Sequence, residues 1–174
     1  MRSRDPACPC FSFTACALDP VGGSQLVGEL KPKIDQAMAA GGPRAATDAF
    51  FDFLCPGLWR SLPEDLRHHY RDNSAELLGD LGMPQYQISR EDLAEIRTPC
   101  LMISGSDSYP ALRSIARIVA ENIPGCKFTE LSGSGHVTYY ERPAEFAAFV
   151  KSFAEALETN DTLNIGLSIT PSIS

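Results

Sequence analysis

The sequence predicts an α/β fold in which a few parallel strands are interrupted by an all-helical insert. Three observations predict it. Two short apolar segments, Cys100–Ser104 and Cys126–Leu131, alternate with segments of helical periodicity, the order that builds a parallel sheet with right-handed crossovers. Helical fragments separated by Gly and Pro fill Leu26–Arg97, and the apolar run Cys10–Leu18 has the β-branched and aromatic content of a short buried strand.

The first strand is followed by Asp19-Pro20-Val21-Gly22-Gly23, which predicts a turn. The insert then contains several helix signals. A helix over Ile34–Ala40 should stop at Gly41-Gly42, and Pro43 suits the first turn of the next helix. The segments Ser61–Glu64 and Ser89–Asp92 both have the spacing of a capping box and predict two further helix starts.

The region after Thr98-Pro99 predicts two strand–helix units. Pro110 opens a helix whose apolar residues recur at i, i+3, i+4 and i+7, and Pro124-Gly125 turns the chain into the second strand. Pro143 begins a final helix with an unbroken apolar stripe, formed by Phe146, Phe149, Val150, Phe153 and Leu157. Residues 158–174 are rich in Ser, Thr and Asn, so we expect a disordered tail there.

Composition narrows the class of function. The chain has 174 residues, a net charge of −7, 44% hydrophobic and 21% charged residues, as in a globular domain. The acidic balance argues against binding to nucleic acid, and no apolar run reaches the ~20 residues of a membrane helix. The six cysteines do not form a metal-binding pattern, so we expect reduced thiols, a cytoplasmic protein, no metal and no cofactor.

His136 is the most informative single residue. It follows the strand Cys126–Leu131 in the loop Ser132-Gly133-Ser134-Gly135-His136. Because the loop leaves the carboxyl end of a parallel strand, the imidazole should emerge where open α/β sheets place their ligands.

The order of these signals resembles the C-terminal part of an α/β-hydrolase. The resemblance covers Val21–Leu157 and is carried by Ile96-Arg97-Thr98-Pro99, Gly105–Ser108, Ile123-Pro124-Gly125, Gly133–His136 and Arg142–Phe146. It implies four regions: a partial core strand over residues 1–20, a helical cap or lid over 21–97, the last core units over 98–157 and a tail over 158–174. It also implies that His136 is the general base of a catalytic triad.

Two aspartates are candidates for the acid that orients His136. In many relatives the acid stands three residues after the glycine that ends the preceding strand; that position is Ser108 here, and Asp107 lies one residue earlier. A subset of relatives takes the acid from the end of the strand before, followed by proline, and Asp19-Pro20 matches that arrangement. We take Asp19 as first choice and Asp107 as second; Asp19 as a turn residue and Asp107 as a helix N-cap are the structural alternatives.

The sequence contains no Gly-x-Ser-x-Gly nucleophile elbow; Gly22-Gly23-Ser24-Gln25-Leu26 comes nearest. Two hypotheses follow. The first is a hydrolase acting on a small ester or amide-type acyl substrate, with cap aromatics such as Trp59 and Tyr70 lining an apolar pocket. The second is a catalytically inactive, truncated remnant that acts as an interaction module, since a sheet of few strands exposes an edge that a second copy or a partner chain can pair with.

Overall fold

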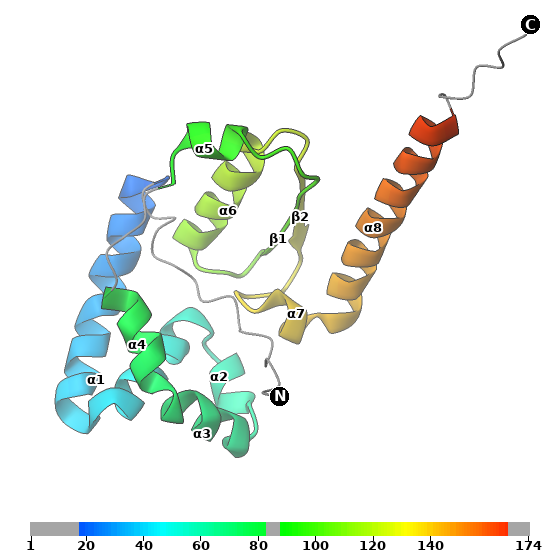
Figure 1. Cartoon of the computed structure of the whole chain (residues 1–174). Coiled ribbons are helices and arrows are strands. Elements are labelled where there is room, and N and C mark those ends of the chain that lie inside the picture. Colours follow the sequence, from blue (N-terminus) through cyan, green and yellow to red (C-terminus); the bar gives the residue numbers. More distant parts are fainter. Residues whose placement is uncertain (1–17, 83–87, 167–174) are drawn as a thin grey trace, which may run out of the picture.

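A computed structural model describes residues 18–82 and 88–166 of the chain. Helices fill the region before the sheet, two strands with a crossover helix follow, and a long C-terminal helix extends away from the rest (Figure 1). The predicted strand Cys10–Leu18 lies outside the described residues except for Leu18, which is buried against Leu93 and Ile123. Within the described residues, no helix combines the length and the apolarity that a membrane span requires.

The helical region consists of α1 (Pro20–Leu54), α2 (Leu58–Ser61), α3 (Glu64–Asp72), α4 (Ser74–Gly82) and α5 (Arg90–Ala94). α1 is broken at Gly42, whose φ of 71° and ψ of −162° are not helical. A positive φ is easily adopted only by glycine, and Pro43 directly afterwards fits the start of the second half of the helix. The helix stop and restart predicted at these residues are therefore confirmed.

The start of α1 differs from the prediction of a turn. Asp19 is the N-cap, and its Oδ1 accepts a hydrogen bond of 3.0 Å from the Gly22 amide. Pro20 occupies the first helical turn, where a missing N–H costs nothing. The Asp-Pro pair acts as a helix start signal, and the two following glycines lie inside the helix.

The two predicted capping boxes have different outcomes. Ser89 caps α5 with a complete capping box: its hydroxyl accepts from the Asp92 amide, and the Asp92 carboxylate accepts from the Ser89 amide. Ser61 does not cap α3, because it ends α2, where its hydroxyl donates to the Leu58 carbonyl at 2.8 Å. Pro63 is the N-cap of α3 instead.

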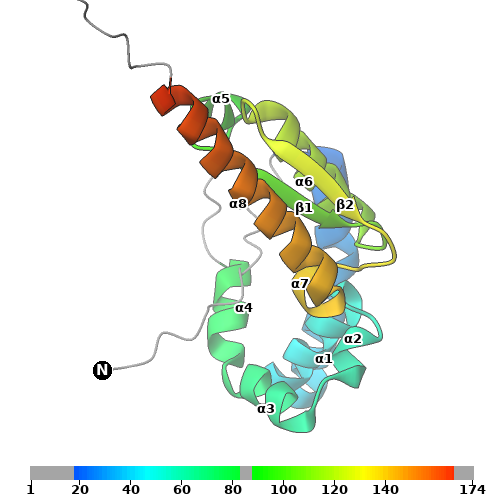
Figure 2. The ribbon, with the colours of Figure 1, turned by 90° about the vertical axis from the view of Figure 1, so that its right-hand side faces the viewer.

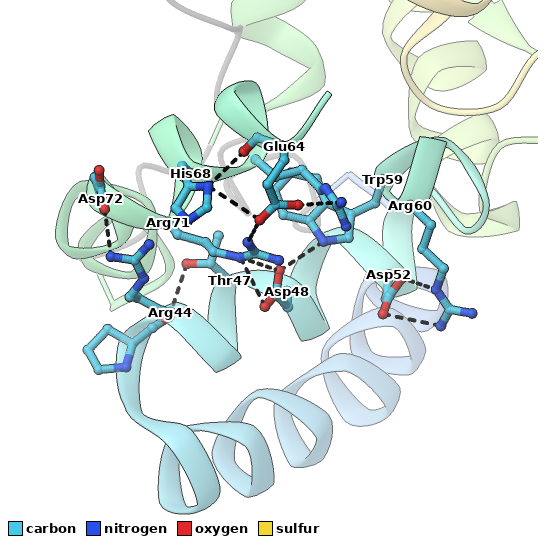
Figure 3. A network of polar contacts seen from close by, with 12 residues as sticks. Arg44, Thr47, Asp48, Asp52, Trp59, Arg60, Glu64, His68, Arg71 and Asp72 are labelled. Carbon is cyan, nitrogen blue, oxygen red and sulfur yellow. Dashed lines mark hydrogen bonds and ion pairs between the residues drawn. The ribbon is translucent and has the colours of Figure 1, made fainter. Parts of the chain in front are cut away.

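A polar network ties α1, α2 and α3 together (Figure 3). The Asp48 carboxylate accepts from the Trp59 indole at 3.0 Å and from Arg71 Nε at 2.9 Å. Arg71 also donates to Glu64 at 2.8 Å. Because Asp48, Trp59 and Arg71 belong to three different helices, these bonds fix the helices relative to one another.

Aromatic side chains of the same region pack against each other. The Phe51 ring is stacked on Trp59 with centroids 4.5 Å apart and meets the edge of Tyr70 at 5.0 Å. Trp59 is only 2% exposed. Trp59 and Tyr70 thus contribute to helix packing, which accounts for their presence without a substrate pocket.

The sheet contains β1 (Leu101–Gly105) and β2 (Lys127–Leu131), which pair in parallel with Leu101 opposite Lys127 and Gly105 opposite Leu131. They are joined by α6 (Pro110–Asn122), whose Leu112 and Ile115 are buried. This confirms the predicted strand–helix–strand unit. Leu112 packs in a cluster with Leu26, Leu30, Phe50 and Leu54 of α1, so the crossover helix joins the sheet to the helical region.

The last two helices are α7 (Thr138–Glu141) and α8 (Pro143–Gly166). α6 and α8 lie on opposite faces of the sheet, and α8 diverges from the strands with distance from α7 (Figures 1 and 2). α8 continues past Leu157, where its apolar stripe ends. Phe149 and Val150 of that stripe are 40% and 43% exposed. A helix of 24 residues is about 36 Å long, whereas five-residue strands span about 17 Å, so the described sheet covers only part of the helix.

Candidate functional site

The candidate site is built from the two loops that follow the parallel strands. The loop after β1 begins at Ser106, and the loop after β2 carries His136. The Asp107 amide donates to the Ser134 carbonyl at 2.8 Å, and the Gly133 amide donates to Ser106 Oγ at 2.8 Å. Both loops lie at the carboxyl end of the sheet, and these hydrogen bonds hold Asp107 and the loop of His136 side by side there.

Gly105, at the end of β1, allows these loops to approach closely. A Cβ atom at this position would lie 2.0 Å from the Gly135 carbonyl oxygen and 2.3 Å from that of Ser134. In the loop itself, Gly133 has a φ of 65°. The backbone beside His136 is therefore packed directly on β1 and requires glycine at the point of contact.

His136 is half-buried. Burial lowers the pKa of its imidazole below the ordinary value of 6.5, and the negative charge of Glu141 opposes part of that shift. A histidine with a lowered pKa is neutral at pH 7, the form that accepts a proton from an attacking hydroxyl. The environment of His136 thus suits a general base.

Asp107 lies beside the His136 loop. Its backbone amide is bonded to that loop, and its exposed carboxylate accepts a hydrogen bond of 2.8 Å from the Ser106 hydroxyl. The structural alternative for this residue, a helix N-cap, is wrong, because Tyr109 is the N-cap residue of α6.

Asp19 makes its hydrogen bonds elsewhere. Beside the Gly22 amide it has a hydrogen bond from the Ser114 side chain of α6, and these bonds lower the pKa of its carboxyl. The structure joins Asp107 to the His136 loop by a hydrogen bond and Asp19 to α1 and α6. Pairing of either carboxylate with His136 stays a prediction.

The site contains one carboxylate that sequence reasoning missed. Glu141, the last residue of α7, accepts hydrogen bonds from the Ser134 hydroxyl at 3.3 Å, the Gly135 amide and the Val137 amide at 3.4 Å. The sequence predicted no helix between the His136 loop and Pro143. Without α7, no predicted element placed Glu141 near His136. Its position five residues after the histidine, just before the Arg-Pro helix start, was the available signal.

Among the described residues, no three His, Cys, Asp or Glu side chains gather as they would around a metal ion. Chemically, the described site offers a neutral base, nearby carboxylates and backbone amides. Acyl transfer further requires a nucleophile. None of the residues in the chain forms the Gly-x-Ser-x-Gly motif.

Several solved structures are similar to the chain in fold. The chain is similar in structure to an enol-lactonase from Burkholderia xenovorans LB400, with a TM-score of 0.55 and 21% identity over 74% of this chain and 51% of that one. It is also similar to MenH from S. aureus, with a TM-score of 0.53 and 22% identity over 82% of this chain and 54% of that one. The corresponding values for Est816, an N-acyl homoserine lactone degrading enzyme, are 0.50 and 20%, over 70% and 51%.

This chain spans about half the length of these solved structures. No curated protein sequence shows significant similarity to it. The sequence pattern described as the Alpha/beta hydrolase family matches residues 5–149, which is most of the chain. The chain belongs to the α/β-hydrolase family.

Proposed function

We propose that the chain carries the histidine and acid part of a hydrolytic site for small ester or lactone substrates, with His136 as general base. The observation that carries the proposal is the half-buried imidazole, which is kept neutral by burial at the carboxyl end of a parallel sheet. Family membership supports a hydrolase-like function. The substrate class is supported by two similar structures described as a lactonase and a lactone-degrading enzyme.

The proposed roles follow from proton transfer. His136 takes the proton of the attacking hydroxyl as the oxygen bonds to the substrate carbonyl, and then gives that proton to the leaving alkoxide. Asp107, or Asp19 as the sequence alone preferred, stabilises the imidazolium formed between these steps. The attacking hydroxyl would belong to a serine of this chain outside a Gly-x-Ser-x-Gly motif, and peptide mapping of the labelled chain would identify it.

The test is labelling of the folded, purified chain with a fluorophosphonate probe, followed by peptide mapping and by hydrolysis assays with a p-nitrophenyl ester and a small lactone. Such probes react with a serine that a neighbouring base has made nucleophilic. Labelling and hydrolysis that are lost in His136→Ala but kept in His68→Ala, which changes an exposed histidine on α3, support the proposal. A folded chain without His136-dependent labelling or turnover contradicts it.

One observation favours a second candidate function, association with a second copy of the chain. Four large apolar side chains of α7 and α8 are between 40% and 45% exposed: Tyr139, Tyr140, Phe149 and Val150. Exposed apolar side chains, where they adjoin on a surface, are typical of interaction sites. Light scattering should then give a dimer that Phe149→Asp converts to a monomer; a wild-type monomer at tens of micromolar contradicts this candidate.

A further inference from the structure

The Glu141 side chain lies against one side of the loop that carries His136 and binds its backbone. Its carboxylate accepts from the residue before His136, through the Gly135 amide, and from the residue after it, through the Val137 amide. A third bond comes from the hydroxyl of Ser134, which is fully buried. Three donors from consecutive parts of one loop thus converge on a single side chain.

The opposite side of the segment is closed by β1. Gly105 lies directly against the Ser134 and Gly135 carbonyl groups, while a Cβ atom on Gly135 would lie 2.9 Å from Glu141 Oε1. The loop backbone is therefore held between β1 and the Glu141 carboxylate, with glycine at both points of contact. Little freedom is left for the peptide groups that orient His136.

Glu141 is also close enough to His136 for its charge to act on the imidazole. Two other charged groups flank the loop: Asp107 on the β1 side and Arg142, whose guanidinium donates to the Gly133 carbonyl at 3.3 Å. Burial is the main cause of the lowered pKa of His136, and the charge of Glu141 acts in the opposite direction. Glu141 combines a mechanical contact with an electrostatic one.

We propose that Glu141 is the positioning residue of the candidate site: its carboxylate fixes the loop on both sides of His136 and so holds the imidazole in its working orientation. The inference rests on the proposed function for its catalytic meaning. Its structural content, a clamp of one carboxylate on one loop, can be measured without any enzymatic turnover.

The experiment uses the full chain and two variants that weaken the clamp from opposite sides. Glu141→Gln keeps the size of the side chain and removes its charge. Gly135→Ala places a methyl group against the carboxylate, and the φ of Gly135 is not in the positive range, so alanine is compatible with the backbone. Glu155→Gln on α8, an exposed residue paired with Lys151, is the control.

Two readouts are needed, both by NMR spectroscopy. Glu141→Gln should titrate His136 at a lower pKa than in the wild type, because the stabilising negative charge is gone. In both clamp variants the amide hydrogens of residues 135 and 137 should exchange about tenfold faster, the effect of losing roughly one hydrogen bond. The His136 signal is assigned by its absence in His136→Asn, and circular dichroism confirms folding.

Unchanged titration of His136 together with unchanged amide exchange in folded Glu141→Gln would overturn the proposal; if that variant does not fold, amide exchange in Gly135→Ala decides. The proposed function fails separately. Ester or lactone hydrolysis that is insensitive to His136→Ala refutes the hydrolytic site and leaves the clamp intact. Hydrolysis that depends on His136 but is unaffected by Glu141→Gln in its rate and pH profile refutes the positioning role alone.

Discussion

The closest backbone contact of the candidate site gives a sharp stability prediction for Gly105→Ala. The added Cβ would lie 2.0 Å and 2.3 Å from two carbonyl oxygens, and Cβ contacts shorter than 3.0 Å essentially never occur. The neighbouring atoms are backbone, so no side chain can rotate away. Either the His136 loop or the end of β1 must move.

Movement of the loop breaks its bonds to the first loop, from the Asp107 amide and to Ser106 Oγ. Two such bonds contribute roughly 1–3 kcal/mol, and overpacking typically adds a strain of about 1–3 kcal/mol. The loss of unfolded-state entropy on replacing glycine offsets about 0.4–1 kcal/mol. The free energy of unfolding should therefore fall by about 1–5 kcal/mol.

Urea unfolding followed by circular dichroism measures this effect. With a denaturant dependence of about 2 kcal/mol per molar, the midpoint should shift down by about 0.5–2.5 M. Gly28→Ala is the matched control, because a Cβ at this exposed position in α1 meets no atom within 4 Å, and it should stabilise the chain by about 0.5–1 kcal/mol. A midpoint for Gly105→Ala equal to that of the wild type would refute the close contact between β1 and the His136 loop.

Four further predictions concern other parts of the chain. Burial lowers the pKa of His136 below 6.5, so the unfolded chain takes up a proton on this residue more readily than the folded chain does. The free energy of unfolding of the wild type should therefore fall as the pH drops below about 6.5. Urea unfolding of His136→Asn should show a weaker dependence of this free energy on pH, and an equal dependence would contradict the prediction. Asp19→Ala removes the N-cap of α1 and should lower the free energy of unfolding by about 1 kcal/mol near neutral pH. Because the pKa of Asp19 is lowered below 3.8, the stability difference between wild type and variant should shrink only when the pH falls below that value. A stability difference that persists in full at pH 2 would contradict this prediction. Arg71→Met leaves the Asp48 carboxylate without its guanidinium partner, so the free energy of unfolding should fall by about 1–3 kcal/mol. Thermal unfolding measures this change. A loss below about 0.5 kcal/mol would show that the network in Figure 3 does not hold the helices together. Cys100 and Cys126 stand one residue before a paired position of the parallel strands, and burial together with the neighbouring Cys100 raises the pKa of Cys126. Hydrogen peroxide should therefore link the two thiols in a disulfide that peptide mass spectrometry detects, each H2O2 taking up the two thiol hydrogens to give two H2O. Exclusive oxidation of either thiol to its acid would argue against their proximity.

Local sequence signals were sufficient for much of the fold. The helix break at Gly42, the capping box at Ser89 and the helix start at Pro110 each depend on a few neighbouring residues. Their backbone requirements are met or violated within one helical turn. The parallel pairing of β1 and β2 follows in the same way, because a crossover helix of this length leaves the chain little choice of direction.

The starts of α1 and α3 could not be predicted from local sequence, because the residues there fit more than one local structure equally well. Asp19 could have started a turn or a helix, and Ser61 could have capped α3 or ended α2. In both cases contacts with neighbouring helices accompany the local structure that is observed. Tertiary contacts such as that between Asp19 and Ser114 of α6 are invisible in a local pattern.

The sequence by itself determined the strand–helix order, the position of His136 after β2 and the resemblance to the hydrolase family, because each is written in residues that are close along the chain. Only the tertiary structure decided which loops meet, that Glu141 turns back onto the His136 loop, and that the apolar stripe of α8 is partly exposed. These features depend on the distances between helices, strands and loops in the folded chain. The two described strands and the four-residue helix α7 set those distances, and no periodicity in the sequence encodes them.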